Sequence, residues 1–121
     1  MSVVGVGIDI VDIKKMKRIV SSKAGKHFLG STFTEKERKY AKDNLLKLAG
    51  IFAAKEAVYK AFGTGWIDGR DVEVTGNRKG APEVKLKGKI KEIAKKRKVG
   101  KIFPSISRTE CCAAAVVVIS S

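Results

Sequence analysis

A carboxylate and an ammonium group lie one helical turn apart near the middle of the chain. They belong to Glu56 and Lys60, within the run Phe-Ala-Ala-Lys-Glu-Ala-Val-Tyr-Lys-Ala-Phe-Gly-Thr-Gly at 52–65. Residues four apart share one face of a helix, so both side chains should point the same way. The pair is either an ordinary surface ion pair, contributing about 0.2 to 0.5 kcal/mol, or part of a site for phosphate and metal.

Two glycines directly after the pair favour the second interpretation. Gly63 is well placed to be the left-handed residue that ends the helix. Gly65 leaves the following backbone without side-chain cover, so amide groups there could approach a phosphate closely. A Glu and Lys pair joined to these glycines therefore predicts phosphate binding at the end of a helix.

A second candidate acid, Asp9, lies in the middle of the apolar run Val-Gly-Val-Gly-Ile-Asp-Ile-Val-Asp-Ile at 4–13. This run predicts a strand that is apolar on both faces. A carboxylate there is costly to bury unpaired, so Asp9 should meet a cation, a metal ion or several hydrogen-bond donors. Asp12 fits the cap of the following helix better than Asp9 does.

Asp9 and Glu56 together suit Mg²⁺. This ion is typically held by one or two carboxylates, while waters and substrate phosphates complete its shell. Softer metals are not indicated, because the single histidine, His27, lies in a loop-like run with no partner at ligand spacing. The sequence therefore predicts Asp9 and Glu56 as metal ligands, with Lys60 as a neighbouring positive charge.

Hydrophobic periodicity and turn residues predict the elements that position these side chains. The expected helices are 12–21, a helix opened by a Thr34 to Glu37 capping box and ending near 43, a long helix ending at 62, and 88–98, with a loop between the first two. The expected strands are 3–10, 71–75, 83–87 and a final hairpin of 102–107 and 111–119.

The predicted fold class is α+β, a small and mostly antiparallel sheet packed against one long and several shorter helices. The strands come as hairpins instead of alternating regularly with helices. We expect one domain over 1–121, because no linker or repeat divides the chain. The apolar run 113–119 has no polar alternation, so both faces of the last strand should be covered, one of them by a subunit contact.

Several motifs resemble those of bacterial holo-[acyl-carrier-protein] synthases, which are 4'-phosphopantetheinyl transferases. They are Gly-Ile-Asp-Ile-Val-Asp-Ile at 7–13, Phe-Thr-x-x-Glu at 33–37, the run at 52–65, Gly-Ala-Pro at 80–82, Leu-Lys-Gly at 86–88 and Ser-Ile-Ser at 105–107. The motifs occur in the order of the family and span nearly the whole chain.

The resemblance implies Mg²⁺-dependent transfer of 4'-phosphopantetheine from coenzyme A to a serine of apo acyl carrier protein. The reaction releases adenosine 3',5'-bisphosphate and supports fatty acid biosynthesis. The resemblance also implies a homotrimer with sites shared between neighbouring subunits. The nucleophile arrives with the carrier, so this chain needs no catalytic serine. Deprotonation of that nucleophile falls either to Glu56 or to a metal-bound water.

The resemblance also assigns roles to individual residues. Asp9, Glu56 and Lys60 match the catalytic positions, with the two acids as metal ligands, and the matched coenzyme contacts are Lys60, Gly63, Thr64, Gly65, Pro82 and Ser105. One position departs from the family, because Arg108 stands where histidine is usual. Arginine cannot act as a base near neutral pH, but its planar fork suits a phosphate, so Arg108 is expected to bind coenzyme A.

Charge points independently to an acidic partner. The chain has 26 lysines and arginines against 12 acidic residues, a formal net charge of +14, and such a field attracts acidic macromolecules. Ile13, Met16 and Val20 form an apolar stripe on the first helix, and its basic residues project elsewhere. In the resembled family the equivalent helix binds the acidic carrier protein, which implies that role for Lys14, Lys15, Lys17 and Arg18. A merely solvated basic face is the alternative.

A small nucleic-acid-binding domain is the alternative from another class. Basic runs such as Lys95-Lys-Arg-Lys98 attract phosphate backbones. This alternative has less support, because no aromatic residue interleaves with the run and no zinc spacing or RNA-binding signature is present. It also leaves Asp9 and Glu56 without a role, so nucleic acid is not expected as a partner.

The remaining features bear on the compartment. No apolar stretch approaches the roughly 18 residues of a membrane span, and the N-terminus lacks the basic-then-apolar order of a signal peptide. A cytoplasmic protein without membrane contact is therefore expected. Cys111 and Cys112 are adjacent in an apolar strand, which would direct them to opposite faces. They are predicted to be small core residues in a reducing compartment.

Overall fold

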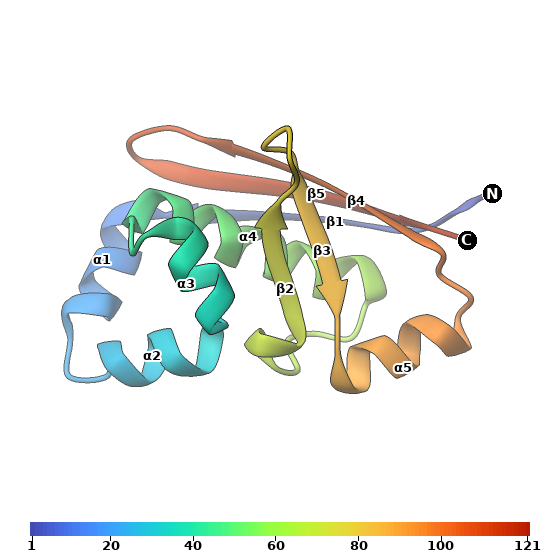
Figure 1. The fold of residues 1–121 in the computed structure, drawn as a ribbon, viewed down its shortest axis with the longest axis horizontal. Coiled ribbons are helices and arrows are strands. Elements are labelled where there is room, and N and C mark those ends of the chain that lie inside the picture. Colours follow the sequence, from blue (N-terminus) through green and yellow to red (C-terminus); the bar gives the residue numbers. More distant parts are fainter.

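The longest helix, α4 (Leu45–Phe62), lies at the centre of the molecule, and most other elements pack against it (Figure 1). The computed structural model describes residues 1–121. Ahead of α4 come β1 (Val3–Asp12), α1 (Ile13–Ser21), α2 (Gly25–Thr32) and α3 (Glu35–Ala41). After it come the short helix η1 (Gly69–Asp71), β2 (Val72–Gly76), β3 (Pro82–Leu86), α5 (Gly88–Lys96), β4 (Lys101–Arg108) and β5 (Cys112–Ser120).

Small and apolar residues on nearly every side make α4 a core helix. Of its 18 residues, 12 are buried, more than a single stripe could supply. The helix contacts β1, β4 and β5 as well as α3 and β2. The Asn44 side chain caps its start by accepting from the Lys47 amide at 3.1 Å, and Gly63 ends it as predicted. Neither α4 nor any other helix has the length and apolarity that a membrane crossing needs.

The strands form two antiparallel sheets. One has three strands in the order β1-β5-β4, with Asp9 opposite Ala115. The other consists of β2 and β3, which pair only with each other. The predicted α+β class is confirmed, and every predicted strand is present with small shifts at its ends. The hairpin of β2 and β3 makes no strand pairing with the larger sheet, but β3 lies against β4 and β2 packs on α4.

One face of the three-stranded sheet covers α4, and the other face is open. Ala113, Ala115, Val117 and Ile119 of β5 are buried in the core. The opposite face exposes the apolar side chains of Val6, Ile8, Ile10, Phe103 and Val116, with Ile8 61% and Ile10 69% exposed. We call these five residues the open sheet face. The prediction that both faces of the last strand are covered is confirmed for one face only, because nothing in the chain packs on the other side. Cover of that second face by a subunit contact stays a prediction.

Two helices were not predicted, the short helix η1 and the longer α2. The segment expected to be a loop after the first helix contains α2, with His27 exposed on it. Phe28 explains its position, since the ring lies edge-on to Phe33 at 6.1 Å and to Phe52 at 5.7 Å between centroids. Packing of this one side chain thus stabilises a helix that the glycine-containing sequence specifies only weakly.

The two cysteines are not core residues, which corrects the prediction. Cys111 is exposed and Cys112 is half-buried. Cys111 lies in the turn before β5, and the two sulfur atoms are 3.9 Å apart. Alternation separates neighbouring side chains only where both residues are inside a strand, so it does not apply to this pair.

A buried ion pair joins α3 and α4 to η1 and to the start of β2. The side chains of Lys55 and Glu37 are fully buried, and Lys55 Nζ lies 2.6 Å from Glu37 Oε1. The ammonium group also donates to the carbonyl oxygens of Gly69 at 2.6 Å and Val72 at 2.5 Å. Its three donors are therefore all used.

Glu37 is equally well satisfied. Its Oε1 accepts from the Thr34 amide at 2.8 Å, within the predicted capping box, and Oε2 accepts from the Val74 amide at 2.7 Å. Burial raises the pKa of Glu37 and lowers the pKa of Lys55, and the ion pair opposes both shifts. A buried charge pair is tolerable when its hydrogen bonds are complete, and this one fixes α4 relative to α3 and β2.

Lys55→Met should destabilise the fold strongly, since Glu37 would keep a buried charge without its partner. The expected loss is about 3 to 5 kcal/mol of unfolding free energy, measured by chemical denaturation at fixed protein concentration. Lys39→Met is the matched control, because Lys39 pairs with Glu35 at the surface at 3.6 Å. That substitution should cost less than about 0.5 kcal/mol. Equal losses in the two variants would contradict the role of the buried pair.

Candidate active site

Glycines let β1 lie directly on the backbone of α4. A Cβ at Gly7 would overlap the carbonyl oxygen of Ala57, and one at Gly5 would overlap that of Ala61. Backbone atoms cannot move aside as the end of a flexible side chain can, so only glycine permits this approach. Asp9, two residues after Gly7, is thereby brought against the last turns of α4.

Lys60 contacts Asp9 and not its helical neighbour Glu56. Its Nζ lies 3.0 Å from Asp9 Oδ1 and donates to the Ile8 carbonyl oxygen at 3.1 Å. The surface ion pair between Glu56 and Lys60, considered from the sequence, does not form. The Asp9 side chain is only 15% exposed, whereas that of Lys60 is 53% exposed. The largely buried carboxylate of Asp9 thus has the cationic neighbour that its burial requires. The ammonium group of Lys60 still faces solvent.

Glu56 lies near Asp9 and makes no hydrogen bond or ion pair within the chain. Its side chain is half-buried. Burial raises the pKa of Glu56 and the negative charge of Asp9 raises it further, whereas Lys60 lowers it. A carboxylate whose ionisation is opposed by burial and by a second carboxylate is stabilised when a cation binds beside it.

Asp9 and Glu56 line a common cavity of about 210 Å³, which we call the acid cavity. Asp12 and Lys15 add polar groups to its lining, and the remaining walls are apolar, from Ile10, Val11, Met16, Ile19, Phe28 and Phe52. These residues come from β1, α1, α2 and α4, so the cavity exists only in the folded chain. Apolar walls strengthen the interactions of the charged groups they surround.

The acid cavity suits a hard divalent cation such as Mg²⁺. It offers two carboxylates, and Glu56 has no cationic partner of its own. The chain contains no group of three or more His, Cys, Asp or Glu side chains that would form a complete metal cage. Mg²⁺ needs no such cage, because waters and substrate phosphates fill much of its shell. Asp9 and Glu56 are the residues that would hold it.

Gly63 has the left-handed conformation that the sequence predicts, and Gly65 shares it. Gly63 and Gly65 are left-handed, with φ of 70° and 73°, and no atom lies within 4 Å of a Cβ placed at either. Thr64 between them is exposed, and its hydroxyl donates to the Gly65 carbonyl oxygen at 2.8 Å. The Tyr59 hydroxyl holds the following loop by donating to the Asp68 carbonyl oxygen at 2.6 Å. The backbone here is therefore open and yet held in place.

Pro82 and Arg108 meet in a second cavity, of about 120 Å³. Tyr40 and Lys47 also line it, and sequence reasoning missed both. No local pattern marks these two residues, because only the fold brings α3 and α4 beside β3 and β4. Ser105 is not part of the lining and is exposed on β4. The predicted coenzyme contacts therefore fall into separate groups within one chain.

The four basic residues of α1 divide between two surfaces. Lys14, Lys17 and Arg18 line one shallow hollow with Ser21 and no acidic residue, while Lys15 lines the acid cavity. The predicted apolar stripe of this helix faces inward, with Met16 buried and Ile13 and Val20 half-buried. Lys14, Lys17 and Arg18 therefore share one basic surface of the helix, and Lys15 faces the acids separately.

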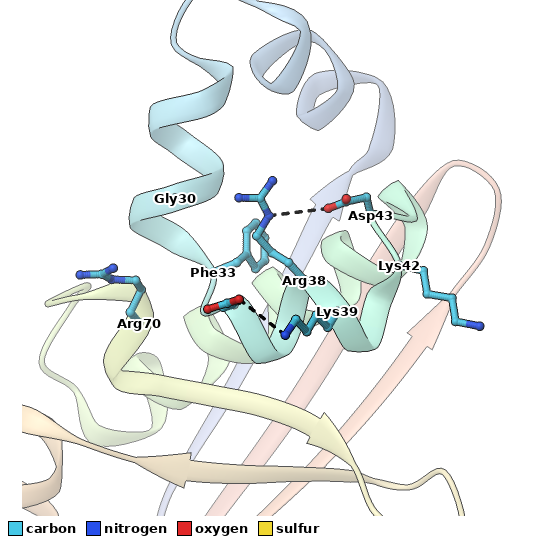
Figure 2. A pocket seen from close by; sticks show the side chains of 8 residues that line it. Gly30, Phe33, Arg38, Lys39, Lys42, Asp43 and Arg70 are labelled. Atoms are coloured by element: carbon cyan, nitrogen blue, oxygen red, sulfur yellow. Dashed lines mark ion pairs between the residues drawn. The ribbon is translucent and has the colours of Figure 1, made fainter.

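A further basic hollow, of about 490 Å³, contains none of the predicted site residues (Figure 2). It is lined from α2, α3, the α3–α4 turn and η1, and its cations are Arg38, Lys39, Lys42 and Arg70. Two of these cations are paired at the surface, Arg38 with Asp43 and Lys39 with Glu35, each at 3.6 Å. Exposed pairs of this kind are solvated and contribute little, and we assign this hollow no role in the site.

Sequence comparison places the chain among known transferases. The family model of the 4'-phosphopantetheinyl transferase superfamily matches residues 5–116. A holo-[acyl-carrier-protein] synthase of Caldanaerobacter subterraneus is 42% identical, covering 93% of this chain and 91% of the relative. One of Caldicellulosiruptor saccharolyticus is 41% identical, covering 93% of each.

Solved structures agree with the sequence comparison. The holo-[acyl-carrier-protein] synthase of Helicobacter pylori, solved in complex with coenzyme A, matches with a TM-score of 0.86 and 32% identity, covering 95% of this chain and 99% of that one. The Neisseria meningitidis enzyme of the same name matches with a TM-score of 0.90 and 28% identity, covering 99% and 100%. The architecture described above is therefore that of these enzymes.

Gly7→Ala should force β1 away from α4, because the new Cβ would overlap backbone atoms. We expect a loss of about 1 to 3 kcal/mol of unfolding free energy, measured by chemical denaturation. Gly30→Ala in α2 is the control, since no atom lies within 4 Å of its Cβ position. Alanine there should raise stability by up to about 1 kcal/mol. A Gly7→Ala protein as stable as the wild type would refute the close approach.

Asp9→Asn should lower the pKa of Glu56, because it removes a negative charge that opposes ionisation. Lys60→Met should raise the same pKa, because it removes a cation that favours ionisation. Carbon-13 NMR titration of the Glu56 carboxyl group in metal-free protein measures both shifts. Shifts in the same direction, or no shift in either variant, would show that the three groups do not interact as described.

Proposed function

The chain belongs to the 4'-phosphopantetheinyl transferase superfamily, and we propose that Asp9, Glu56 and Lys60 form the centre of its reaction. That reaction moves phosphopantetheine from coenzyme A to apo acyl carrier protein. The names of its relatives specify a phosphopantetheinyl transferase that makes holo acyl carrier protein, and one solved relative is in complex with coenzyme A. The observation that carries the proposal is the convergence of Asp9 with Lys60 at 3.0 Å, in a cavity that Asp9 shares with Glu56.

The reaction joins the carrier serine to the phosphate at the end of the pantetheine arm. The serine oxygen attacks the phosphorus atom, the bond from phosphorus to the leaving nucleotide breaks, and adenosine 3',5'-bisphosphate departs. Catalysis of such a transfer depends mainly on positioning and on neutralising charge at the phosphate oxygens. The tasks of this chain are therefore to hold the diphosphate and to help remove one proton from the serine.

Asp9 and Glu56 are proposed to hold Mg²⁺ against the diphosphate. When bound, Mg²⁺ neutralises charge on the phosphate oxygens and stabilises the leaving phosphate. The raised pKa of Glu56 supports this assignment, because burial and Asp9 both oppose its ionisation while no cation is bound. Lys60 adds a fixed positive charge, since Asp9 and the Ile8 carbonyl oxygen hold its ammonium group in one position.

Glu56 is the better placed of the two acids to accept the serine proton. Asp9 is already paired with Lys60, whereas Glu56 has no hydrogen-bond or ion-pair partner in the chain. An unpaired carboxylate oxygen can accept a proton from a nearby hydroxyl group. Water at the site is the alternative proton acceptor.

Coenzyme A is proposed to span two groups of residues. Lys60, Gly63, Thr64 and Gly65 would contact the diphosphate, because they lie on or directly after the last turn of α4. Pro82, Ser105 and Arg108 would contact the nucleotide, with the Arg108 fork on a phosphate. Pro82 and Arg108 line a different cavity from the acids. That separation supports a complete site built by two neighbouring subunits.

The open sheet face is proposed as the contact that builds a homotrimer. Its five apolar side chains lie on three adjacent strands, and every one of them is exposed in the single chain. A contiguous patch of exposed apolar side chains is more often a protein interface than a surface that stays in contact with solvent. Association through this face would cover the second side of β5.

The acidic carrier is proposed to dock on α1. Lys14, Lys17 and Arg18 share a surface there without an acidic residue, and Lys15 reaches the acid cavity. Because β1 continues directly into α1, a carrier bound on this helix would bring its serine close to Asp9.

We further propose that the chain acts as one domain in the cytoplasm and supports fatty acid biosynthesis.

Asp9→Asn and Glu56→Gln should each lower Mg²⁺-dependent transfer by at least about a hundredfold. Both substitutions remove a charge that holds the ion and leave the volume of the side chain unchanged. Transfer is measured by the intact mass of apo carrier protein after incubation with coenzyme A and Mg²⁺. Glu92→Gln, an exposed carboxylate on α5, is the control and should keep full activity. Near-normal turnover in either site variant would refute the metal assignment.

Reversing charge on α1 with Lys14→Glu and Arg18→Glu should raise the KM for the carrier protein by roughly tenfold at low salt, and by less at high salt. Affinity for coenzyme A should not change. Lys89→Glu with Lys96→Glu on α5 is the matched control, because it changes the net charge equally at another exposed helix. If both double variants raise the KM to the same extent, net charge explains the effect and the docking proposal fails.

A further inference from the structure

Cys111 and Cys112 form a pair of thiols outside the proposed transfer centre. They are the 2 cysteines of the chain, and both are free. Their sulfur atoms lie 3.9 Å apart, although neighbouring side chains in a strand normally point in opposite directions. Cys111 is exposed in the turn between β4 and β5, so small thiol reagents can reach it.

Thr109 organises the pair. Its hydroxyl oxygen lies 3.3 Å from the Cys111 amide nitrogen and 3.2 Å from that of Cys112, and it accepts from both. The same oxygen lies 3.2 Å from Cys111 Sγ and 3.6 Å from Cys112 Sγ. Because the oxygen already accepts two amide hydrogens, its own hydrogen can be donated to a sulfur atom or to the Cys112 carbonyl oxygen, which lies 3.5 Å away.

This environment favours the thiolate at Cys111. Hydrogen bonding with the Thr109 hydroxyl and with the Cys112 thiol lowers the pKa of Cys111, and slight burial and the negative charge of Glu110 oppose this shift only in part. Reactive cysteines are those whose thiolate is stabilised at an accessible position. Cys112 is the only other thiol, and it stands within reach of any adduct that forms on Cys111.

We propose that Cys111 and Cys112 are a reversible dithiol site, which low-molecular-weight disulfides convert to an intramolecular disulfide. The Cys111 thiolate attacks one sulfur of the reagent, breaks its S–S bond and releases one thiolate. Cys112 then attacks the Cys111 sulfur of the mixed disulfide and releases the second thiolate. The two thiol protons pass to the released thiolates, so the protein is oxidised by two electrons and the reagent is reduced to two thiols.

Covalent geometry makes this disulfide easy to reduce again. Disulfide-bonded residues usually have Cα atoms about 4.4 to 6.8 Å apart, whereas adjacent Cα atoms are about 3.8 Å apart. A disulfide between neighbours is therefore strained. Strained and exposed disulfides are the labile ones, so this bond suits reversible control and not structural support.

Formation of the disulfide should change the hydrogen bonding at the start of α1. The Ile13 amide donates to the Cys111 carbonyl oxygen at 3.0 Å, and Asp12, which caps α1, lies opposite Cys112 in the sheet. Joining the sulfurs turns the peptide between the cysteines and so reorients that carbonyl group. Any effect on carrier binding rests on the proposed function, in which α1 is the docking helix.

The test is intact-mass spectrometry of the reduced, assembled protein after incubation with glutathione disulfide and an acid quench. The wild type should lose two hydrogen atoms with no glutathione attached, and dithiothreitol should restore its mass. Cys112→Ser should stop at a mixed disulfide with one glutathione, and Cys111→Ser should react more slowly than Cys112→Ser. Wild-type chains that stop at glutathione adducts, that link to other chains, or that do not react would overturn the proposal.

Amide hydrogen exchange measures the coupling to α1 separately. The Ile13 amide should exchange faster in the oxidised wild type than in the reduced one. A variant with both cysteines replaced by serine, treated with the same reagent, should show no change. Unchanged exchange in the oxidised wild type would overturn the coupling. Neither measurement uses coenzyme A or carrier protein, so failure here is distinct from failure of the proposed transfer function.

Discussion

The site depends on how closely β1 approaches α4. Gly5 and Gly7 remove the side chains that would keep strand and helix apart, and the following Asp9 then reaches Lys60 at 3.0 Å. A carboxylate in an apolar strand is costly to bury alone, so this contact fixes the position of the strand along the helix as well as its distance. The arrangement of the proposed site follows from this close approach of β1 to α4.

The same approach brings together two carboxylates that repel each other. Asp9 is neutralised by Lys60, but Glu56 keeps a raised pKa because burial and the charge of Asp9 oppose its ionisation. The surrounding fold supplies the force that holds the two acids near one another, notably the buried pair of Lys55 and Glu37 that fixes α4. In the proposed site, a cation would relieve this repulsion before any substrate arrives, as a preorganised site requires.

Local patterns were sufficient to predict the parts of the fold that local interactions determine. Asp12 caps α1, Thr34 and Glu37 form the capping box, and Gly63 ends α4, because each depends on residues within one helical turn. The motifs around Asp9 and Glu56 indicated the family that the family model also matches. The contact of Asp9 with Lys60 needed the fold, because it joins residues far apart in the sequence.

Long-range packing explains what the sequence did not reveal. A lysine in a helix is usually exposed. Lys55 can be buried because its ammonium group binds Glu37 and the carbonyl oxygens of Gly69 and Val72. Helix α2 depends on aromatic contacts with distant residues, and Lys47 joins Arg108 in a cavity only after the sheet has formed. The two cysteines lie close because of a turn whose geometry strand alternation does not describe.

The most direct measurement is a crystal structure with coenzyme A and Mn²⁺ in place of Mg²⁺, with anomalous data collected on both sides of the manganese edge. The account predicts one manganese ion in contact with the carboxylates of Asp9 and Glu56 and with the diphosphate. An ion bound elsewhere, or a diphosphate bound away from both carboxylates in every subunit, would contradict it.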